Sequence, residues 1–384
     1  MRSGSKRATL PLLTPWWRLS RGKINLGPIS LKTFLIFLLI SIFFPVPVVL
    51  AGEGAAVYRE QHWAVTAEKF ELALERLRVG KKTRIQSPIV LVHGLFVNSL
   101  FFNLDEEQSL ARYLAKEGFD VWNLSLRGTG RSLGPLKGGA KSWTLDDIIE
   151  KDLSAVIRYV QKESRNSQVI WVGYEMGGLL AYGYLEKKAS PGLAALVTIG
   201  APVTFNHPQQ EPMKRLLKLE ESPALKKIFL YLNSPFLGSY LIPLIPKMEE
   251  FFYNRENIEE EIKEKFLANA LAEINPGILD HLLRIIQRGE FVSAEGNFSY
   301  RKNLAKIQLP LLLIGGEKDQ VAPPEAIRTV YRAVGSTDRT LRILGPRSKN
   351  SAAYGHIDLI LGKKAKEEVF SVISRWLKQR DGRE

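Results

Sequence analysis

A strand that turns sharply into a helix carries the most informative residue of the sequence. Residues 169–180 read Val-Ile-Trp-Val-Gly-Tyr-Glu-Met-Gly-Gly-Leu-Leu. Gly173 and Gly177 let strand and helix approach closely, which holds the side chain between them at the top of a sheet in a strained backbone conformation. The spacing is G-x-S-x-G, the frame that presents a nucleophilic serine. Glu175 stands in the serine's position.

Two segments farther along the chain supply partners for this position. Asp319 lies in Gly-Gly-Glu-Lys-Asp-Gln-Val-Ala-Pro, directly after an apolar strand. His356 lies in Tyr-Gly-His-Ile-Asp, ahead of a closing helix. An acid in such a loop can accept a hydrogen bond from a histidine and fix its tautomer. Some hydrolases carry their nucleophile on such a strand-to-helix turn, which is called the nucleophile elbow. The order 175, 319, 356 is the nucleophile, acid, base order of these hydrolases.

A fourth segment predicts an oxyanion hole, the pair of N–H groups that stabilises negative charge on a reacting oxygen. Gly94 and Leu95 follow the apolar strand 89–92. In elbow hydrolases a backbone N–H from this place joins the N–H of the residue after the nucleophile, here Met176. We therefore predict Leu95 and Met176 as the two donors. The loop 127–132, Arg-Gly-Thr-Gly-Arg-Ser, lacks the phosphate-binding pattern and is interpreted as a tight turn.

Strands and helices alternate through most of the body. Apolar runs at 89–92, 120–124, 169–172, 193–199 and 309–315 alternate with helical patterns such as 109–116 and 148–163. This order predicts an α/β fold with a mostly parallel central sheet and helices on both faces. Between Pro202 and Asn303 only helical patterns remain, so we expect a core of residues 52–201 and 304–384 with a helical lid at 202–303. The apolar stretch 234–252 within that lid favours an apolar substrate pocket.

With these motifs together, residues 58–377 resemble the α/β-hydrolases, and within them the bacterial acid-lipase-like branch, with a lesser likeness to polyhydroxyalkanoate synthases. The likeness rests on His-Trp-Ala-Val-Thr at 62–66, Phe-Asp-Val-Trp at 119–122 and Tyr-Gly-His-Ile-Asp at 354–358. Members of that branch usually carry Gly-His-Ser-Met-Gly-Gly where this chain has Gly-Tyr-Glu-Met-Gly-Gly. The resemblance implies the fold and an ester-type, lipid-like or other apolar small-molecule substrate, while Tyr174 and Glu175 depart from it.

Three roles for Glu175 stay open at this stage. As a nucleophile it would form a covalent ester, as carboxylates do in hydrolases of epoxides and haloalkanes. As a general base it would activate water for direct attack. As an inert carboxylate it would, with Asp319, hold His356 as an imidazolium. Three functions stay open with these roles. The first is a hydrolase of apolar esters, and the second is an epoxide or haloalkane hydrolase with a carboxylate nucleophile. The third is an inactive homologue that binds an apolar ligand or partner.

The N-terminus predicts the compartment. Residues 1–32 carry seven Lys or Arg and no acid, and the uncharged run 33–51 follows. This is typical of a signal peptide cleaved after Ala51, or of a membrane anchor, and places the domain outside the cytoplasm. These residues supply half of the net charge of +14, so we expect no nucleic-acid partner. With no cysteine and no metal-binding histidine spacing, we expect no disulfide, metal or cofactor.

Overall fold

The structure is a computed structural model that describes residues 56–80, 87–132, 142–188, 192–211 and 248–380. They belong to one compact unit, Ala55–Glu384. The predicted N-terminal segment 1–51 and most of the apolar stretch 234–252 lie outside the described residues.

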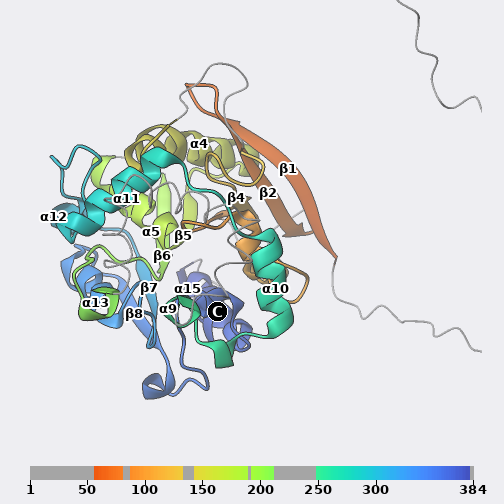
Figure 1. Cartoon of the computed structure of the whole chain (residues 1–384). Helices are drawn as coiled ribbons and strands as arrows, with labels where there is room; N and C mark the ends of the chain where they lie inside the picture. The colour runs from red at the N-terminus through yellow and green to blue at the C-terminus, as the bar shows by residue number, and fades with distance from the viewer. Residues whose placement is uncertain (1–55, 81–86, 133–141, 189–191, 212–247, 381–384) are drawn as a thin grey trace, which may run out of the picture. The chain divides into compact units, whose positions relative to one another are not determined.

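An eight-stranded sheet forms the centre of this unit (Figure 1), with the strand order β1-β2-β4-β3-β5-β6-β7-β8. The first two strands pair antiparallel with each other, and β2 pairs antiparallel with β4. All other pairs are parallel. The strands are β1 (Val57–Val65), β2 (Glu71–Val79), β3 (Ile89–Val92), β4 (Val121–Leu124), β5 (Val169–Tyr174), β6 (Leu193–Ile199), β7 (Leu311–Gly316) and β8 (Arg339–Leu344). The predicted mostly parallel sheet is confirmed.

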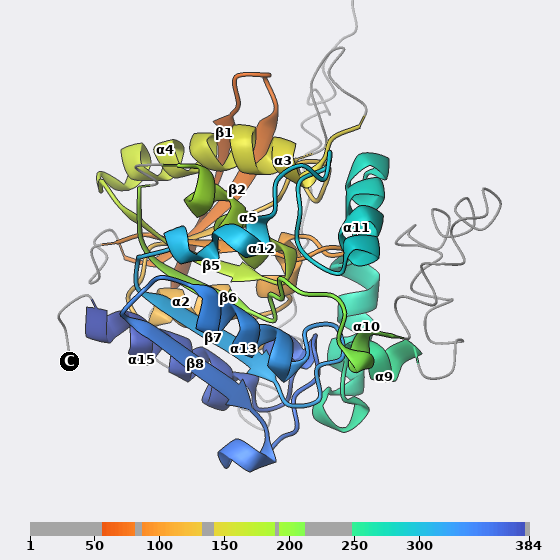
Figure 2. The same cartoon turned by 90° about the vertical axis from the view of Figure 1, so that its left-hand side faces the viewer.

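Helices cover both faces of the sheet (Figures 1 and 2). Alternate side chains of a strand point to opposite faces of the sheet, and here both faces bury apolar side chains, in two separate clusters. Burial of these two clusters stabilises the packing of helices on both faces. The core helices are α2 (Leu110–Lys116), α3 (Leu145–Asp147), α4 (Leu153–Ser164), α5 (Met176–Lys187), α13 (Pro324–Ala333), α14 (Asp358–Leu361) and α15 (Ser371–Arg380).

The described part of residues 202–303 contributes helices and none of the eight strands. They are α9 (Met248–Phe252), α10 (Glu260–Asn269), α11 (Pro276–Arg288) and α12 (Tyr300–Asn303). In Figure 2, α9, α10 and α11 lie on the same side of the sheet. Local sequence sets the ends of α11: Asn275 accepts the N–H of Gly277, Pro276 opens the helix, and Gly289 ends it at φ +70°.

Candidate active site

Glu175 lies at the sharp turn between β5 and α5, in a backbone conformation that few side chains adopt. Its φ is 48° and its ψ is −112°, in the positive-φ region that costs roughly 1–3 kcal/mol for such a residue. The turn is tight because a Cβ on Gly173 would lie 2.4 Å from the Gly177 backbone, and one on Gly177 would lie 2.1 Å from the Val92 oxygen. Strand β3, helix α5 and the elbow therefore touch backbone to backbone.

The carboxyl group of Glu175 occupies the predicted oxyanion hole. The Leu95 N–H donates to Oε2 at 2.7 Å, and the Met176 N–H also bonds to the carboxyl group. A Cβ on Gly94 would lie 2.8 Å from Oε2, so a side chain there would collide with the carboxylate. The two N–H groups that the sequence predicted for a substrate oxygen thus meet on the protein's own Glu175.

His356 and Asp319 form a buried pair beside this group. The two side chains are joined by a 2.7 Å hydrogen bond between Nδ1 and Oδ2. The other oxygen of Asp319 accepts the N–H groups of Val321 at 2.9 Å and Ala322 at 2.7 Å. A carboxylate fixed in this way holds the proton on Nδ1 and leaves Nε2 as the basic nitrogen. The structure thus brings together all five predicted catalytic and oxyanion residues.

Burial and the neighbouring charged groups shift the pKa values of Glu175 and His356 in opposite directions. Desolvation raises the pKa of Glu175, and the positive charge of His356 with the N–H groups of Leu95 and Met176 only partly offsets it. Desolvation by itself lowers the pKa of His356, but the carboxylates of Asp319, Glu175 and Asp358 outweigh it, so the net pKa is raised. A raised imidazole pKa means that His356 takes up a proton more readily than a free histidine does.

Tyr174, the second departure from the resemblance, packs directly against the base. Its ring centroid lies 4.9 Å from that of His356 and 4.6 Å from that of Phe101. The side chain is buried, and its hydroxyl has no hydrogen-bond partner among the described residues. Desolvation raises the Tyr174 pKa well above its ordinary value, so the hydroxyl stays neutral. Tyr174 therefore acts as an apolar wall for the imidazole.

Asp358 is a site residue that the sequence did not single out, although it belongs to the Tyr-Gly-His-Ile-Asp segment. Its buried carboxylate accepts the N–H of Gly355 at 3.0 Å, the N–H of Asn254 at 3.2 Å and the side-chain amide of Asn257 at 2.7 Å. The bonds to Asn254 and Asn257 join the loop of His356 to the segment between α9 and α10. Partners about 100 positions away leave no local signal in the sequence.

Asn98 makes a similar connection on the other side of the hole. Its side-chain amide donates to the carbonyl oxygens of Asn269 at 3.0 Å and Leu271 at 3.2 Å. Its backbone N–H donates to Ala270 at 2.9 Å. The loop that carries Leu95 is thus bonded to the segment between α10 and α11.

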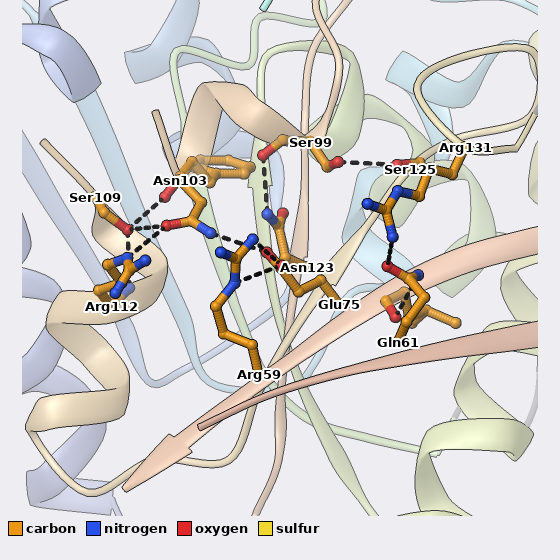
Figure 3. Close-up of polar contacts among 12 residues, drawn as sticks. Arg59, Gln61, Glu75, Ser99, Asn103, Ser109, Arg112, Asn123, Ser125 and Arg131 are labelled. Carbon is orange, nitrogen blue, oxygen red and sulfur yellow. Dashed lines mark hydrogen bonds and ion pairs between the residues drawn. The ribbon is translucent and has the colours of Figure 1, made fainter. Parts of the chain in front are cut away.

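Polar side chains hold the next turn, Ser99–Phe102, on the sheet (Figure 3). The Asn123 amide donates to the Ser99 carbonyl at 2.8 Å, and the hydroxyls of Ser99 and Ser125 lie 2.8 Å apart. Asn103 donates to Glu75 of β2 at 2.8 Å. The oxyanion loop is therefore fixed from both sides, by the helical region and by the sheet.

The remaining buried histidines have structural partners. Burial lowers the pKa of His93 to about 4, and its Nε2 accepts the Leu126 N–H at 3.1 Å. His281 accepts the Leu145 N–H at 3.3 Å and contacts the Val292 carbonyl at 2.8 Å. Within the described ranges, no group of three or more His, Asp or Glu side chains is placed to hold a metal ion.

Comparison with known proteins agrees with this fold. The family model described as serine aminopeptidase, S33, matches residues 83–345. Triacylglycerol lipase 1 of Arabidopsis thaliana is 25% identical, covering 81% of this chain and 84% of the lipase. A probable lipase of Schizosaccharomyces pombe is 22% identical, covering 82% and 74%. A thermophilic esterase from Thermogutta terrifontis shares the fold with a TM-score of 0.55 at 20% identity, covering 84% of this chain and 99% of the esterase. Because the family model spans more than half of the sequence, the chain belongs to the serine aminopeptidase S33 family of α/β-hydrolases.

Proposed function

We propose that this protein hydrolyses apolar, ester-type substrates at the site formed by Glu175, His356 and Asp319. The observation that carries the proposal is the assembled oxyanion hole, in which the Leu95 N–H binds a carboxylate oxygen at 2.7 Å beside a histidine held by an aspartate. The relatives named as lipases support the substrate class. We further propose that residues 202–303 cover the substrate.

In the ester route, the substrate carbonyl displaces Glu175 from the hole. His356 then removes a proton from a water molecule, which attacks the carbonyl carbon, and the oxyanion takes the N–H groups of Leu95 and Met176. The intermediate collapses with expulsion of the alcohol, which receives the proton from His356. Displacing the carboxylate breaks hydrogen bonds to a charged group, each of which contributes roughly 1.5–3 kcal/mol. This cost makes the ester route slow.

The occupied hole favours a second candidate, in which Glu175 is itself the nucleophile. With Oε2 held by Leu95, Oε1 attacks the saturated carbon of an epoxide or haloalkane, and that carbon's bond to oxygen or halogen breaks. The halide leaves, or the opened epoxide oxygen takes a proton from water. Water activated by His356 then attacks the carboxyl carbon of the Glu175 ester and releases the alcohol. The oxyanion of this second step develops on Oε2, which already lies in the hole.

Single turnover in ¹⁸O-labelled water separates the two routes. The substrates are p-nitrophenyl butyrate, styrene oxide and 1-bromohexane, with Glu175→Gln as the matched control. The ester route places the label in the released acid, whereas the covalent route leaves it in the Glu175 carboxylate, which peptide mass spectrometry detects. If wild type turns over none of the three substrates and Glu175→Ser gains esterase activity, the proposal is wrong and the result favours a non-catalytic role for Glu175.

We also propose that the domain acts outside the cytoplasm, either released after cleavage at Ala51 or held at the membrane. The support is the basic and then apolar sequence of residues 1–51. None of the helices that the structure describes is long and apolar enough to cross a membrane. N-terminal sequencing of the native protein should start at or near Gly52 if the segment is cleaved. Full-length protein in the soluble cytosol would contradict both versions.

A further inference from the structure

Helix α10 is anchored to the rest of the protein by one buried aromatic side chain. Of the ten residues of α10, all of which the structure describes, only Phe266 is buried. Its ring packs in a T-shaped arrangement on Phe101, with 6.0 Å between the ring centroids. Phe101 belongs to the turn Ser99–Phe102, which follows the loop of the oxyanion hole. Phe266 is therefore the apolar anchor of α10 on this turn.

The contacts between rings continue from Phe101 to His356. The Phe101 centroid lies 4.6 Å from that of Tyr174, and the Tyr174 centroid lies 4.9 Å from that of His356. Rings with centroids about 4.5–7 Å apart make favourable contacts. All four side chains are buried. Phe266, Phe101 and Tyr174 thus form a buried aromatic row that joins α10 to the imidazole.

Two further contacts of the imidazole come from the sheet. Asp319, in the loop after β7, is bonded to Nδ1 at 2.7 Å. A Cβ on Gly200, directly after β6, would lie 2.9 Å from Cε1 of His356. The Gly200 N–H donates to Ile314 of β7 at 2.8 Å, which fixes this backbone. The sheet therefore restricts the Nδ1 and Cε1 atoms, whereas Tyr174 supports the ring from the aromatic row.

A close-packed row transmits the loss of one ring to the next. Protein interiors contain few voids, so side chains next to a removed ring either shift or border a cavity. Loss of the Phe266 ring removes packing from Phe101, and through Phe101 from Tyr174. The imidazole of His356 then keeps its bond to Asp319, but the ring that packs against it is no longer fixed.

We propose that Phe266, Phe101 and Tyr174 are positioning residues, through which helix α10 sets the orientation of the His356 imidazole. A base removes a proton only within hydrogen-bond reach of its target, so the seating of α10 controls whether His356 is in place to react. That His356 acts as the base rests on the proposed function. The position of its ring does not, and it is therefore measured without turnover.

The test follows the Nδ1 proton of His356 by NMR in the ¹⁵N-histidine-labelled full chain. This proton is held in the bond to Asp319, and it exchanges with water when the imidazole moves away. His356→Gln identifies the signal. The Nε2 proton of His281, which is donated to the Val292 carbonyl at 2.8 Å, is the internal control in the same spectrum.

Removal of either end of the aromatic row should speed the exchange of the His356 proton. We expect Tyr174→Leu and Phe266→Leu each to accelerate it about 2- to 12-fold, the factor that corresponds to one aromatic contact. The His281 proton should keep its wild-type rate in both variants. Tyr174→Phe, which keeps the ring and removes only the hydroxyl, should leave the His356 proton at the wild-type rate.

Two further variants separate transmission along the row from a general loosening of the core. Phe291→Leu is the matched control, because Phe291 is also buried and stacks on Tyr300 at 4.4 Å in the apolar cluster of the other face. It should not change the exchange of the His356 proton. In the Tyr174→Leu background, Phe266→Leu should add no further acceleration, because the row is already broken.

Any of four results overturns the proposal. They are a wild-type rate in Tyr174→Leu or Phe266→Leu, an acceleration in Tyr174→Phe as large as in Tyr174→Leu, an equal acceleration in Phe291→Leu, and full additivity in the double variant. Phe266→Met, which removes the ring and keeps most of the volume, replaces Phe266→Leu if that variant does not fold. A failure of the isotope experiment leaves these exchange rates unaffected, so the two proposals are tested independently.

Discussion

At the scale of single residues, the position of one carboxyl group determines what the site can do. A serine at position 175 would leave the N–H groups of Leu95 and Met176 for the substrate, whereas the carboxylate of Glu175 uses them itself. The same carboxylate adds negative charge next to His356. Glu175 therefore changes both the hole and the base.

Replacing Glu175 with serine should increase the rate of ester hydrolysis. The variant supplies a hydroxyl in reach of a base that Asp319 already orients, and it empties the hole. We expect Glu175→Ser to hydrolyse p-nitrophenyl butyrate at least about 100-fold faster than Glu175→Ala, which empties the hole but adds no nucleophile. Burst kinetics would show the acyl-enzyme. Equal rates in the serine and alanine variants would mean that the His356 pair cannot activate a nucleophile.

Removing the Glu175 charge should lower the pKa of His356. Three carboxylates raise that pKa in wild type, with Asp319 contributing most. In Glu175→Gln one of the three is neutral, so the imidazole should lose its proton at a lower pH, and activity that needs the free base should persist further into acid. NMR titration of the His356 Cε1 proton measures the shift. Glu290→Gln, a change at a carboxylate paired with Arg301, is the control, and a His356 titration that is unchanged in Glu175→Gln contradicts the assigned electrostatics.

At the scale of elements, the helices α9 and α10 and the segment after α10 are hydrogen-bonded to the loops that carry His356 and Leu95. Phe252, at the end of α9, accepts the N–H groups of His356 at 3.1 Å and Ile357 at 2.9 Å. The Phe96 carbonyl accepts the N–H of Ala272 at 2.8 Å, next to the Asn98 contacts described above. Both halves of the site, the base and the hole, thus depend on residues after position 247.

Asn98 offers a test of this dependence. Asn98→Ala removes the two amide bonds to the segment after α10 and also the side-chain acceptor for the Leu100 N–H. We expect a loss of about 1–3 kcal/mol in the free energy of unfolding, and faster hydrogen exchange at the Leu95 amide. Asn269→Ala is the control because only the backbone oxygen of Asn269 contacts Asn98. If Leu95 exchanges at the wild-type rate in Asn98→Ala, the contact does not position the hole.

Much of the fold could be predicted from the sequence because its signals are local. Apolar runs, the glycines around Glu175 and the acid after β7 each report on neighbouring residues, and their order along the chain matches a known arrangement. Two features have no such signal. The occupation of the hole depends on the conformation of one side chain, and the Asn98 contacts join residues more than 170 positions apart.

At the scale of the whole molecule, buried acids set how stability varies with pH. Burial raises the pKa of Asp152 to about 6 despite the Arg127 guanidinium. It raises the pKa of Glu186 to about 9, with Lys306 and Lys187 only partly offsetting the effect. An acid whose pKa is higher in the folded than in the unfolded state stabilises the fold at low pH, and this stabilisation is lost as the pH rises.

The effect of Glu186 on the pH dependence of stability can be measured with a single substitution. It lies near the end of α5, is 6% exposed, and neither carboxylate oxygen has a hydrogen-bond partner among the described residues. Its folded pKa of about 9 against 4.5 for the free side chain predicts that the free energy of unfolding falls between pH 4.5 and 9. Glu186→Gln stays neutral, so it should flatten this slope and be more stable than wild type at pH 8, by an amount on the order of a few kcal/mol. Urea denaturation across this pH range measures both proteins, with Glu290→Gln as the control that should keep the wild-type slope. Parallel curves for wild type and Glu186→Gln would show that Glu186 finds a partner or water in solution, and that its carboxylate is ionised in the folded protein at neutral pH.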